Sequence, residues 1–307
     1  MILITGASGT VGRELVKRMA RPEERIRAMV RDRDRAASIA YPGVDLVSGD
    51  FANIQSLDDA LSGVNKAFLL TAPSPDQLEW ETNFLEAASR SNLRHIVKLS
   101  ALGAAPDSPA RLFRAHAEAE IRLQNSGIPY TILRPNQFMQ NFLNFRDSII
   151  HRGEFYAPMG DGHISIVDVR DVAAVAEAVL CEYGYEDKIF DITGPESLTY
   201  ADIASRFSLE LGKPVAFVDV PPETMADAML ENGLPHWMVE GLLEMFAIWK
   251  FNGASEVAGT ITHVAKGEPT SFRQFAHDYA PQFGYADRDP LQKIMDVVTF
   301  DSMTPGK

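Results

Sequence analysis

Residues 1–12 have the sequence MILITGASGTVG, and this stretch indicates the fold of the chain. A short β-branched run, Ile2–Ile4, passes into a loop of small residues that leads directly into helix-like sequence. Gly6, Gly9 and Gly12 let the backbone turn sharply and approach a ligand closely, because glycine has no Cβ. The free N–H groups and the positive dipole end of the helix attract a pyrophosphate. A strand, a glycine-rich loop and a helix in this order predict a nucleotide-binding unit rather than a plain turn.

The length and composition are those of an ordinary globular protein. With 307 residues, the chain is long enough for one large domain or two moderate ones. It has no apolar run of about 18 residues and begins directly in a strand, so neither a membrane span nor a signal peptide is expected. The single cysteine, Cys181, excludes an internal disulfide and fits a cytoplasmic protein. We expect Cys181 to be a buried, small apolar side chain.

The charge is distributed unevenly along the chain. Residues 1–150 contain 18 Lys and Arg against 17 Asp and Glu, whereas residues 151–307 contain 11 against 25, so the net charges are +1 and −14. An acidic surface repels phosphate backbones, so a nucleic-acid partner is not expected. The acidic half is most simply explained as exposed surface that aids solubility.

Strands and helices alternate through the first half of the chain. The expected strands are Ile2–Ile4, Ile26–Val30, Val44–Val47, Lys66–Leu70, His95–Leu99 and Pro129–Leu133. The clearest expected helices between them are Ile54–Leu61, Asp76–Ser91 and Ser108–Asn125. This alternation predicts an α/β fold, a Rossmann-like doubly wound parallel sheet. Ligands then bind beyond the carboxyl ends of the strands.

Residues 1–150 are predicted to form the NAD(P)-binding domain, with 164–194 returning to it, and 151–307 a smaller, mainly helical substrate region. Residues 151–159 look irregular, and Ile164–Val167 is expected to be a short strand. Pro221–Ile248 is expected to be helical and is rich in methionine and aromatic residues, which suit either a flat apolar ligand or an ordinary helix core. Ile294–Phe300 is interpreted as an appended strand.

Arg31 indicates which cofactor the unit prefers. In NAD-binding folds, the end of the second strand usually carries an acid that holds the ribose 2′-hydroxyl. Here that position carries Arg31, whose guanidinium suits a 2′-phosphate and favours NADP(H) over NAD(H). The alternative is that residues 31–35 are a solvated charge run that caps the next helix. After the third strand, Asp50 and Phe51 are placed to meet an adenine, although Asp50 could equally cap the following helix.

The motifs taken together resemble a known family. They are TGASGTVG at Thr5–Gly12, VR at Val30–Arg31, GD at Gly49–Asp50, LSALGA at Leu99–Ala104, HAEAE at His116–Glu120, SGIPYTILRPNQFMQN at Ser126–Asn141 and VDVRDVAAV at Val167–Val175. These motifs resemble those of atypical short-chain dehydrogenases, and within them the NmrA-like family with its bacterial quinone and triphenylmethane-dye reductases. The resemblance covers roughly residues 1–215 and is vague from Val220 onward.

The resemblance implies a site for NADP(H) and no metal. It implies that the cofactor lies along Gly6, Ala7, Ser8, Gly9, Thr10 and Val11, with Arg31 at the 2′-phosphate and Asp50 and Phe51 near the adenine. It further implies that the ribose is flanked by Leu70, Thr71, Ala72 and Pro73, and the nicotinamide by Ser100, Ala101, Pro135, Asn136 and Phe138.

His116 is the candidate catalytic residue. The wider superfamily uses a Tyr-x-x-x-Lys pair on this helix, but residues 108–125 contain neither Tyr nor Lys. Isoflavone-reductase-like enzymes carry a Lys where this chain has His116. An imidazole whose pKa lies near 6.5 can give or take a proton at working pH. His116 could instead position the cofactor or substrate, or be a helix residue satisfied by Glu120 one turn on.

Two functions remain open from the sequence. The first is an NADPH-dependent oxidoreductase that transfers hydride to a small, flat, electron-poor acceptor such as a quinone. Its expected partner is a small aromatic or conjugated substrate and not a membrane. Whether the chain forms a homodimer is left open by the sequence. The second is a non-catalytic NADP(H)-sensing regulator that acts through a protein partner, which the missing Tyr and Lys favour. A sugar-nucleotide epimerase is the least favoured, since it needs that pair.

Overall fold

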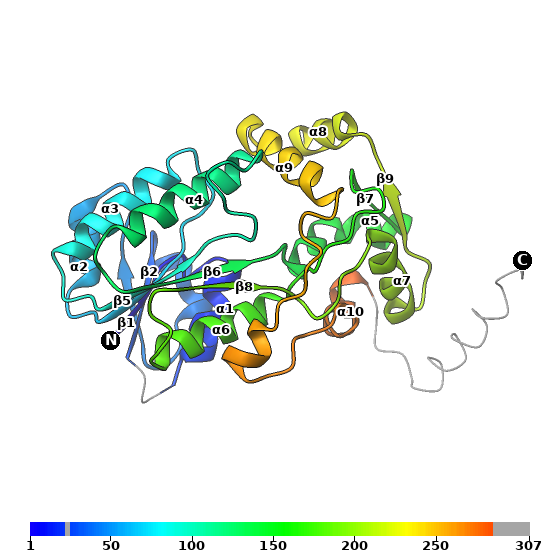
Figure 1. The fold of residues 1–307 in the computed structure, drawn as a ribbon. Helices are drawn as coiled ribbons and strands as arrows, with labels where there is room; N and C mark the ends of the chain where they lie inside the picture. The colour runs from blue at the N-terminus through cyan, green and yellow to red at the C-terminus, as the bar shows by residue number, and fades with distance from the viewer. Residues whose placement is uncertain (22–24, 285–307) are drawn as a thin grey trace, which may run out of the picture. The chain divides into compact units, whose positions relative to one another are not determined.

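The computed structural model describes residues 1–21 and 25–284, so the expected strand Ile294–Phe300 lies outside the described residues. Its chain forms two units, whose helices and strands are labelled in Figure 1. The first unit comprises Met1–Asn136, Val169–Thr193 and Ala258–Pro269. The second comprises Gln137–Asp168, Gly194–Val257 and the chain from Thr270 onward. The chain therefore passes between the two units several times.

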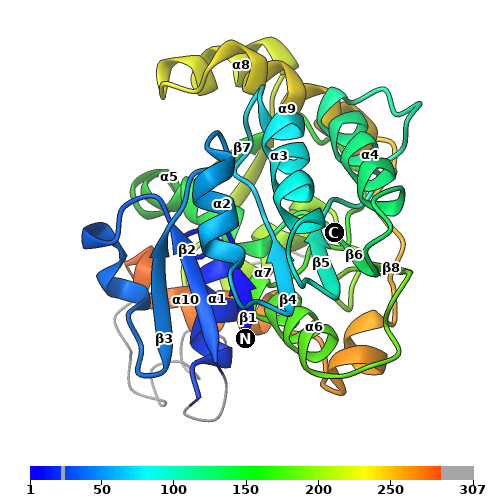
Figure 2. The same ribbon diagram turned by 90° about the vertical axis from the view of Figure 1, so that its left-hand side faces the viewer.

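A parallel sheet of seven strands forms the centre of the first unit. Its order is β3-β2-β1-β4-β5-β6-β8, and every neighbouring pair is parallel (Figure 2). The strands are β1 (Ile2–Ile4), β2 (Ile26–Val30), β3 (Val44–Ser48), β4 (Lys66–Leu69), β5 (His95–Leu99), β6 (Tyr130–Pro135) and β8 (Lys188–Ile192). The order reverses between β1 and β4, which is the usual ligand position in such sheets. The predicted Rossmann-like α/β fold is confirmed.

Helices cover both faces of this sheet. Figure 1 shows α2 (Ile54–Leu61), α3 (Gln77–Ser89) and α4 (Arg111–Gln124) on one face, and α1 (Thr10–Met19) and α6 (Val169–Cys181) on the other. Each helix turns an apolar stripe to the sheet. In α1 the buried side chains recur at helical spacing and are Val11, Leu15, Val16 and Met19. The connections between parallel strands are therefore helices, as the alternating sequence predicts.

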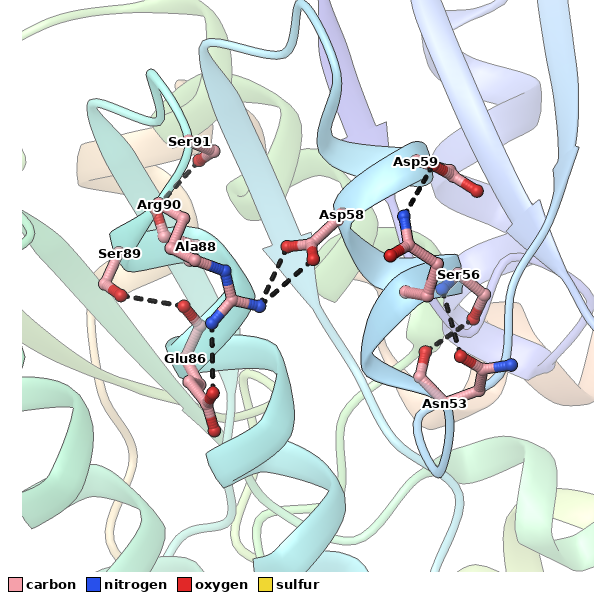
Figure 3. A network of polar contacts seen from close by, with 10 residues as sticks. Asn53, Ser56, Asp58, Asp59, Glu86, Ala88, Ser89, Arg90 and Ser91 are labelled. Atoms are coloured by element: carbon pink, nitrogen blue, oxygen red, sulfur yellow. Dashed lines mark hydrogen bonds and ion pairs between the residues drawn. The ribbon is translucent and has the colours of Figure 1, made fainter.

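A polar network joins α2 to α3 on the same face of the sheet (Figure 3). The Arg90 guanidinium donates to both carboxylate oxygens of Asp58, at 3.0 and 3.1 Å, and to Glu86 at 3.0 Å. Asn53 caps α2, because its side-chain oxygen accepts a hydrogen bond from the Ser56 N–H. The cap and the ion pair fix where α2 begins and how it lies beside α3.

The second unit has a small parallel pair of strands and an aromatic core. Strand β7 (Glu154–Ala157) pairs with β9 (Ala216–Asp219), and the unit's helices are α5 (Arg146–Arg152), α7 (Tyr200–Leu211), α8 (Pro222–Glu231), α9 (His236–Trp249) and α10 (Phe272–Tyr279). Phe142 lies edge-on to Phe155 and Phe272, each at 5.4 Å between ring centroids, and Phe207 packs on Phe272 at 4.9 Å. Edge-to-face rings add packing energy to simple burial.

Several expectations about the second half of the chain are wrong. Residues 151–159 are not irregular, because they hold the end of α5 and all of β7. Ile164–Val167 is not a continuous strand and pairs only through isolated bridges at Ile164 and Val167. Pro221–Ile248 is helical as expected, in two helices separated by a turn, and α8 ends before Gly233, whose φ is +82°.

Cys181 is exposed, not buried as expected. It is the last residue of α6, whose buried residues include Val172, Val175, Ala176 and Val179. Two positions beyond Val179, a side chain points away from that stripe. Within the described residues, no helix is both long and apolar enough to cross a membrane.

Candidate cofactor and active site

The loop after β1 is packed too closely for side chains at two of its glycines. Gly6 has φ +60°, and a Cβ there would lie 2.8 Å from the Leu70 carbonyl oxygen. A Cβ on Gly12 would lie 2.2 Å from the Gly6 carbonyl oxygen, whereas one on Gly9 would lie 3.2 Å from it. Gly12 therefore lets the first turn of α1 pack directly against the loop, and Gly6 supplies the left-handed turn.

The start of α1 is suited to an anion. Gly9 is the N-cap residue and has no side chain to occupy the helix N–H groups, and the first turn contains no acidic residue. The Arg13 guanidinium reaches back to the Ser8 carbonyl oxygen at 3.1 Å. N–H groups at an uncapped helix start, next to an arginine, fit the diphosphate of a dinucleotide.

Thr5 ties this loop to the end of β4. Its hydroxyl lies 3.1 and 3.0 Å from the carbonyl oxygens of Phe68 and Leu70, and it accepts from the Leu70 N–H at 2.8 Å. The loop at residues 6–12 and the segment that follows β4 are thereby held side by side at the point where the strand order reverses. Two segments predicted to flank the cofactor are brought together.

Arg31, Asp50 and Phe51 follow the ends of β2 and β3. Arg31 is exposed and forms no ion pair with any residue that the structure describes. The Asp50 carboxylate accepts from the Ala52 N–H at 2.9 Å and does not cap α2, since Asn53 does. The capping alternative for Asp50 is therefore wrong. Phe51 is half-buried and packs on Phe84 at 6.2 Å between centroids.

The remaining predicted cofactor residues differ in how far their side chains are accessible. The side chains of Ala72 and Pro73 are exposed, those of Leu70 and Ala101 are half-buried, and those of Ala7, Val11, Thr71, Ser100, Pro135 and Asn136 are buried. All of these follow β1, β4, β5 or β6 in the first unit except Pro135, which is the last residue of β6. Phe138 belongs to the second unit, where it pairs with Val167. A role for the buried members in cofactor binding would involve their backbone groups.

A buried ion pair that was not predicted from the sequence lies in the first unit. Lys98 on β5 is fully buried, and its ammonium lies 2.5 Å from Oε2 of Glu81 on α3, which is 3% exposed. Glu81 Oε1 accepts from the Thr71 hydroxyl at 2.9 Å and from the Gln77 amide at 3.1 Å. Burial alone would raise the pKa of Glu81, but the charge and hydrogen bond of Lys98 outweigh it, so the pKa is lowered. Glu81 is therefore a carboxylate.

A second buried network holds Ser100. The Glu120 carboxylate on α4 accepts from the Ser100 hydroxyl at 2.5 Å and from both Nε and a terminal nitrogen of Arg134. The hydrogen bond and charge of Glu120 raise the pKa of Arg134. Glu120 is thus occupied by Ser100 and Arg134, and the interpretation of His116 as a helix residue satisfied by Glu120 is wrong.

His116 is half-buried on α4 and is neutral at physiological pH. Burial lowers its pKa to about 4, and the positive charge of Lys98 adds to this while Glu81 opposes it. Its Nδ1 is buried and has no hydrogen-bond partner among the described residues. A neutral imidazole can form hydrogen bonds but is a poor proton donor at pH 7, which favours the positioning role over proton transfer.

One sequence signal could have revealed this network. Lys98 lies in His95–Leu99, where it interrupts the apolar run Ile96, Val97 and Leu99. The strand is buried along its whole length. A lysine is almost never fully buried without a partner, so its place in a central strand requires a carboxylate nearby. The sequence does not say which acid that is, because Glu81 is 17 residues away on another element.

Comparisons with known proteins find relatives that match nearly the whole chain. A model of the NmrA-like family matches residues 1–276. The NAD(P)H azoreductase of Xenophilus azovorans is 35% identical over 93% of this chain and 100% of that protein. The NADPH-dependent quinone oxidoreductase of Escherichia coli, solved with NADPH, has a TM-score of 0.83 at 27% identity and covers 91% of this chain and 99% of that one. Citrobacter sp. triphenylmethane reductase, solved with NADP(H), has a TM-score of 0.82 at 25% identity over 91% and 100%.

Proposed function

This chain belongs to the NmrA-like family, and from that membership we propose that it transfers hydride from NADPH to a small, flat, electron-poor acceptor such as a quinone. It is an NAD(P)H-dependent oxidoreductase of the quinone, azo and dye reductase type, like the relatives that it matches over nearly all of their length. The proposal adds the preference for NADPH and the class of acceptor, which is aromatic or conjugated.

One observation carries the proposal: the uncapped start of α1 is packed against a loop that admits no side chain at Gly6 or Gly12. This arrangement brings backbone N–H groups close to a diphosphate. Arg31 supports the choice of NADPH, because an exposed guanidinium that follows β2 is placed to bind a 2′-phosphate. These residues bind and orient the cofactor.

Quinone reduction suits a site without a Tyr-x-x-x-Lys pair. Bound NADPH supplies the hydride, and the product is a hydroquinone monoanion that takes one proton from water. The acceptor is reduced by two electrons and NADPH is oxidised to NADP⁺, so no strong base or acid from the protein is required. The protein's contribution is then binding, orientation and the exclusion of competing reactions.

The experiment is NADPH oxidation, followed by absorbance, with a panel of quinones, azo compounds and triphenylmethane dyes. We expect turnover with at least one quinone and slower turnover with NADH at the same concentration. Tight NADPH binding without turnover on any acceptor would overturn the proposal. That outcome would favour the alternative function, an NADP(H)-sensing regulator, which the lack of Tyr and Lys on α4 also favours. Recovery of a protein partner that depends on the cofactor's redox state would then identify it.

A further inference from the structure

The Lys98–Glu81 ion pair places a fixed positive charge inside the first unit. Both side chains are buried, and the 2.5 Å contact leaves no solvent between them. Glu81 also accepts from Thr71 and Gln77, so both of its oxygens are occupied in its ionised form. The Lys98 ammonium has one hydrogen bond among the described residues, to Glu81. Its remaining N–H groups keep a positive field in the surrounding interior.

His116 lies within this field, and its two ring nitrogens differ. Nδ1 is the buried nitrogen and has no partner among the described residues, while the ring as a whole is half-buried. A proton on Nδ1 would be buried without an acceptor and repelled by the Lys98 ammonium. A lone pair on Nδ1 is instead favoured by that charge. The charged groups that act on His116 are Lys98 from β5 and Glu81 from α3, whereas Glu120 on α4 is bound to Arg134.

We propose that the burial of Nδ1, together with the Lys98 ammonium, holds His116 as a neutral imidazole whose single proton is on Nε2, so that His116 is a hydrogen-bond donor and not an acid. Lys98 is then a positioning residue that acts through His116. The direction of the shift in the pKa of His116, to about 4, agrees with this arrangement. In the reaction proposed above, on which this last step rests, Nε2–H donates to an oxygen of the acceptor. The proton that completes the reduction comes from water.

The protonation state can be measured without any turnover. Nitrogen-15 NMR of the intact, histidine-labelled protein distinguishes Nδ1–H, Nε2–H and the doubly protonated ring. We expect His116 to carry its proton on Nε2 and to remain neutral from about pH 5 to 8. A proton on Nδ1, or titration of His116 near pH 6.5, would overturn the inference.

Substitutions at the ion pair give an ordered set of shifts. Lys98→Met removes the cation, and burial then raises the pKa of Glu81, so the repulsion that lowers the pKa of His116 is lost and the pKa of His116 should rise. Glu81→Gln leaves the Lys98 ammonium without its counter-charge, so the pKa of His116 should not rise. The double variant Glu81→Gln/Lys98→Met keeps the shape without either charge, so the pKa of His116 should likewise be higher than in the wild type. This variant remains informative if Lys98→Met alone does not fold. An unchanged pKa of His116 in both variants would contradict the role of Lys98.

Lys66→Met is the matched control, because Lys66 is also a lysine on a strand of the same sheet. Lys66 donates to the carbonyl oxygens of Leu180 and Glu182 at 2.6 and 3.2 Å, and its charge lowers the pKa of His95. Its removal should therefore raise the pKa of His95 and leave that of His116 unchanged. A general loosening of the fold would change the pKa of both His95 and His116 in both variants.

Kinetics then separate this inference from the proposed function. If a quinone is reduced, the wild-type kcat should be flat from about pH 5 to 8, and Lys98→Met should acquire a pH-dependent step as His116 begins to titrate. His116→Gln, which retains an N–H donor, should keep more activity than His116→Leu. If no acceptor is reduced, the NMR measurement still tests the protonation state of His116, independently of the proposed function. Turnover with a doubly protonated His116 at pH 7 would refute the inference and leave the proposed function intact.

Discussion

At the scale of the residue, the site depends on a close approach between backbone segments that a side chain at Gly6 or Gly12 would prevent. Gly6 and Gly12 were identifiable from their spacing, because only glycine allows the turn and the close contact that the structure contains. Lys98 and Glu81 were not identifiable as a pair, since a lysine and an acid 17 residues apart meet only once the sheet and α3 have formed. Sequence spacing predicts local geometry, whereas long-range ion pairs require the tertiary fold.

Gly12→Ala should destabilise the protein and weaken NADPH binding. Its Cβ would lie 2.2 Å from the Gly6 carbonyl oxygen, so the loop and α1 must move apart. Overpacking of this kind costs about 1–3 kcal/mol. Urea unfolding and a fluorescence titration with NADPH measure the two effects. Gly9→Ala is the matched control, with a 3.2 Å contact, and should cost less; equal losses in both variants would contradict the argument.

Arg31→Ala should weaken NADPH binding far more than NADH binding. If Arg31 contacts the 2′-phosphate, loss of a charge-assisted hydrogen bond costs about 1–3 kcal/mol and affects only the phosphorylated cofactor. Dissociation constants for both cofactors provide the test. Arg33→Ala, which removes another exposed arginine two residues on, is the control. An equal loss for NADPH and NADH in Arg31→Ala would refute the assignment.

At the scale of the element, the strands of the main sheet were the most predictable part of the chain. They are short apolar runs between loops and helices, and β2 and β5 have the predicted bounds. Helix α7 begins with a capping box formed by Thr199 and Asp202, a short-range pattern of the kind that sequence spacing reveals. Strands β7 and β9 were missed because each has four residues and its pairing partner lies about 60 residues away. Such strands are specified by their partner and by the aromatic core beneath them.

Asn53→Ala should destabilise the protein by about 1 kcal/mol, because α2 loses the side chain that caps it. The effect should appear as a lower urea midpoint with an unchanged slope. Asp50→Ala removes a nearby side chain that bonds only the Ala52 N–H in the turn before the helix, and it should cost less. A larger loss in Asp50→Ala would mean that the helix start is held differently.

At the scale of the whole molecule, the family motifs predicted the fold class and the type of enzyme, but not the acceptor. Most of the motifs lie at the carboxyl ends of strands, where the chemistry of a cofactor restricts the sequence, whereas His116–Glu120 lies within α4 and Val167–Val175 leads into α6. The region after residue 220 carries no comparable restriction from a shared cofactor. The assignment of the first unit to the cofactor and of the second to the acceptor therefore remains a proposal.

The protein should lose stability as the pH falls below about 6.5. His95 and His116 both have lowered pKa values in the folded state, so the unfolded chain binds more protons between the two values. The contribution of each is complete above the unfolded pKa and is lost as the pH falls through the pKa of the folded state, which is about 4 for His116. A shift of that size corresponds to about 3 kcal/mol at most for His116. Thermal unfolding from pH 4 to 8 measures it.

The matched variants are His116→Gln and His151→Gln. The first should make the dependence of stability on pH shallower, and the second, which replaces an exposed histidine, should leave it unchanged. A wild-type profile that is flat over this range would show that neither buried histidine resists protonation. Both substitutions replace the imidazole by a neutral amide of similar size, so the comparison concerns charge and not volume.

The interleaving of the two units along the chain has a consequence for biosynthesis. Strand β8 pairs with β6, yet residues 137–168 of the second unit are translated between them. A ribosome therefore releases β1 to β6 before the strand that covers β6 exists. A chain truncated near residue 136 and released from the ribosome would expose β6 as an open sheet edge, which is a template for aggregation. Neither unit can be produced as one uninterrupted fragment.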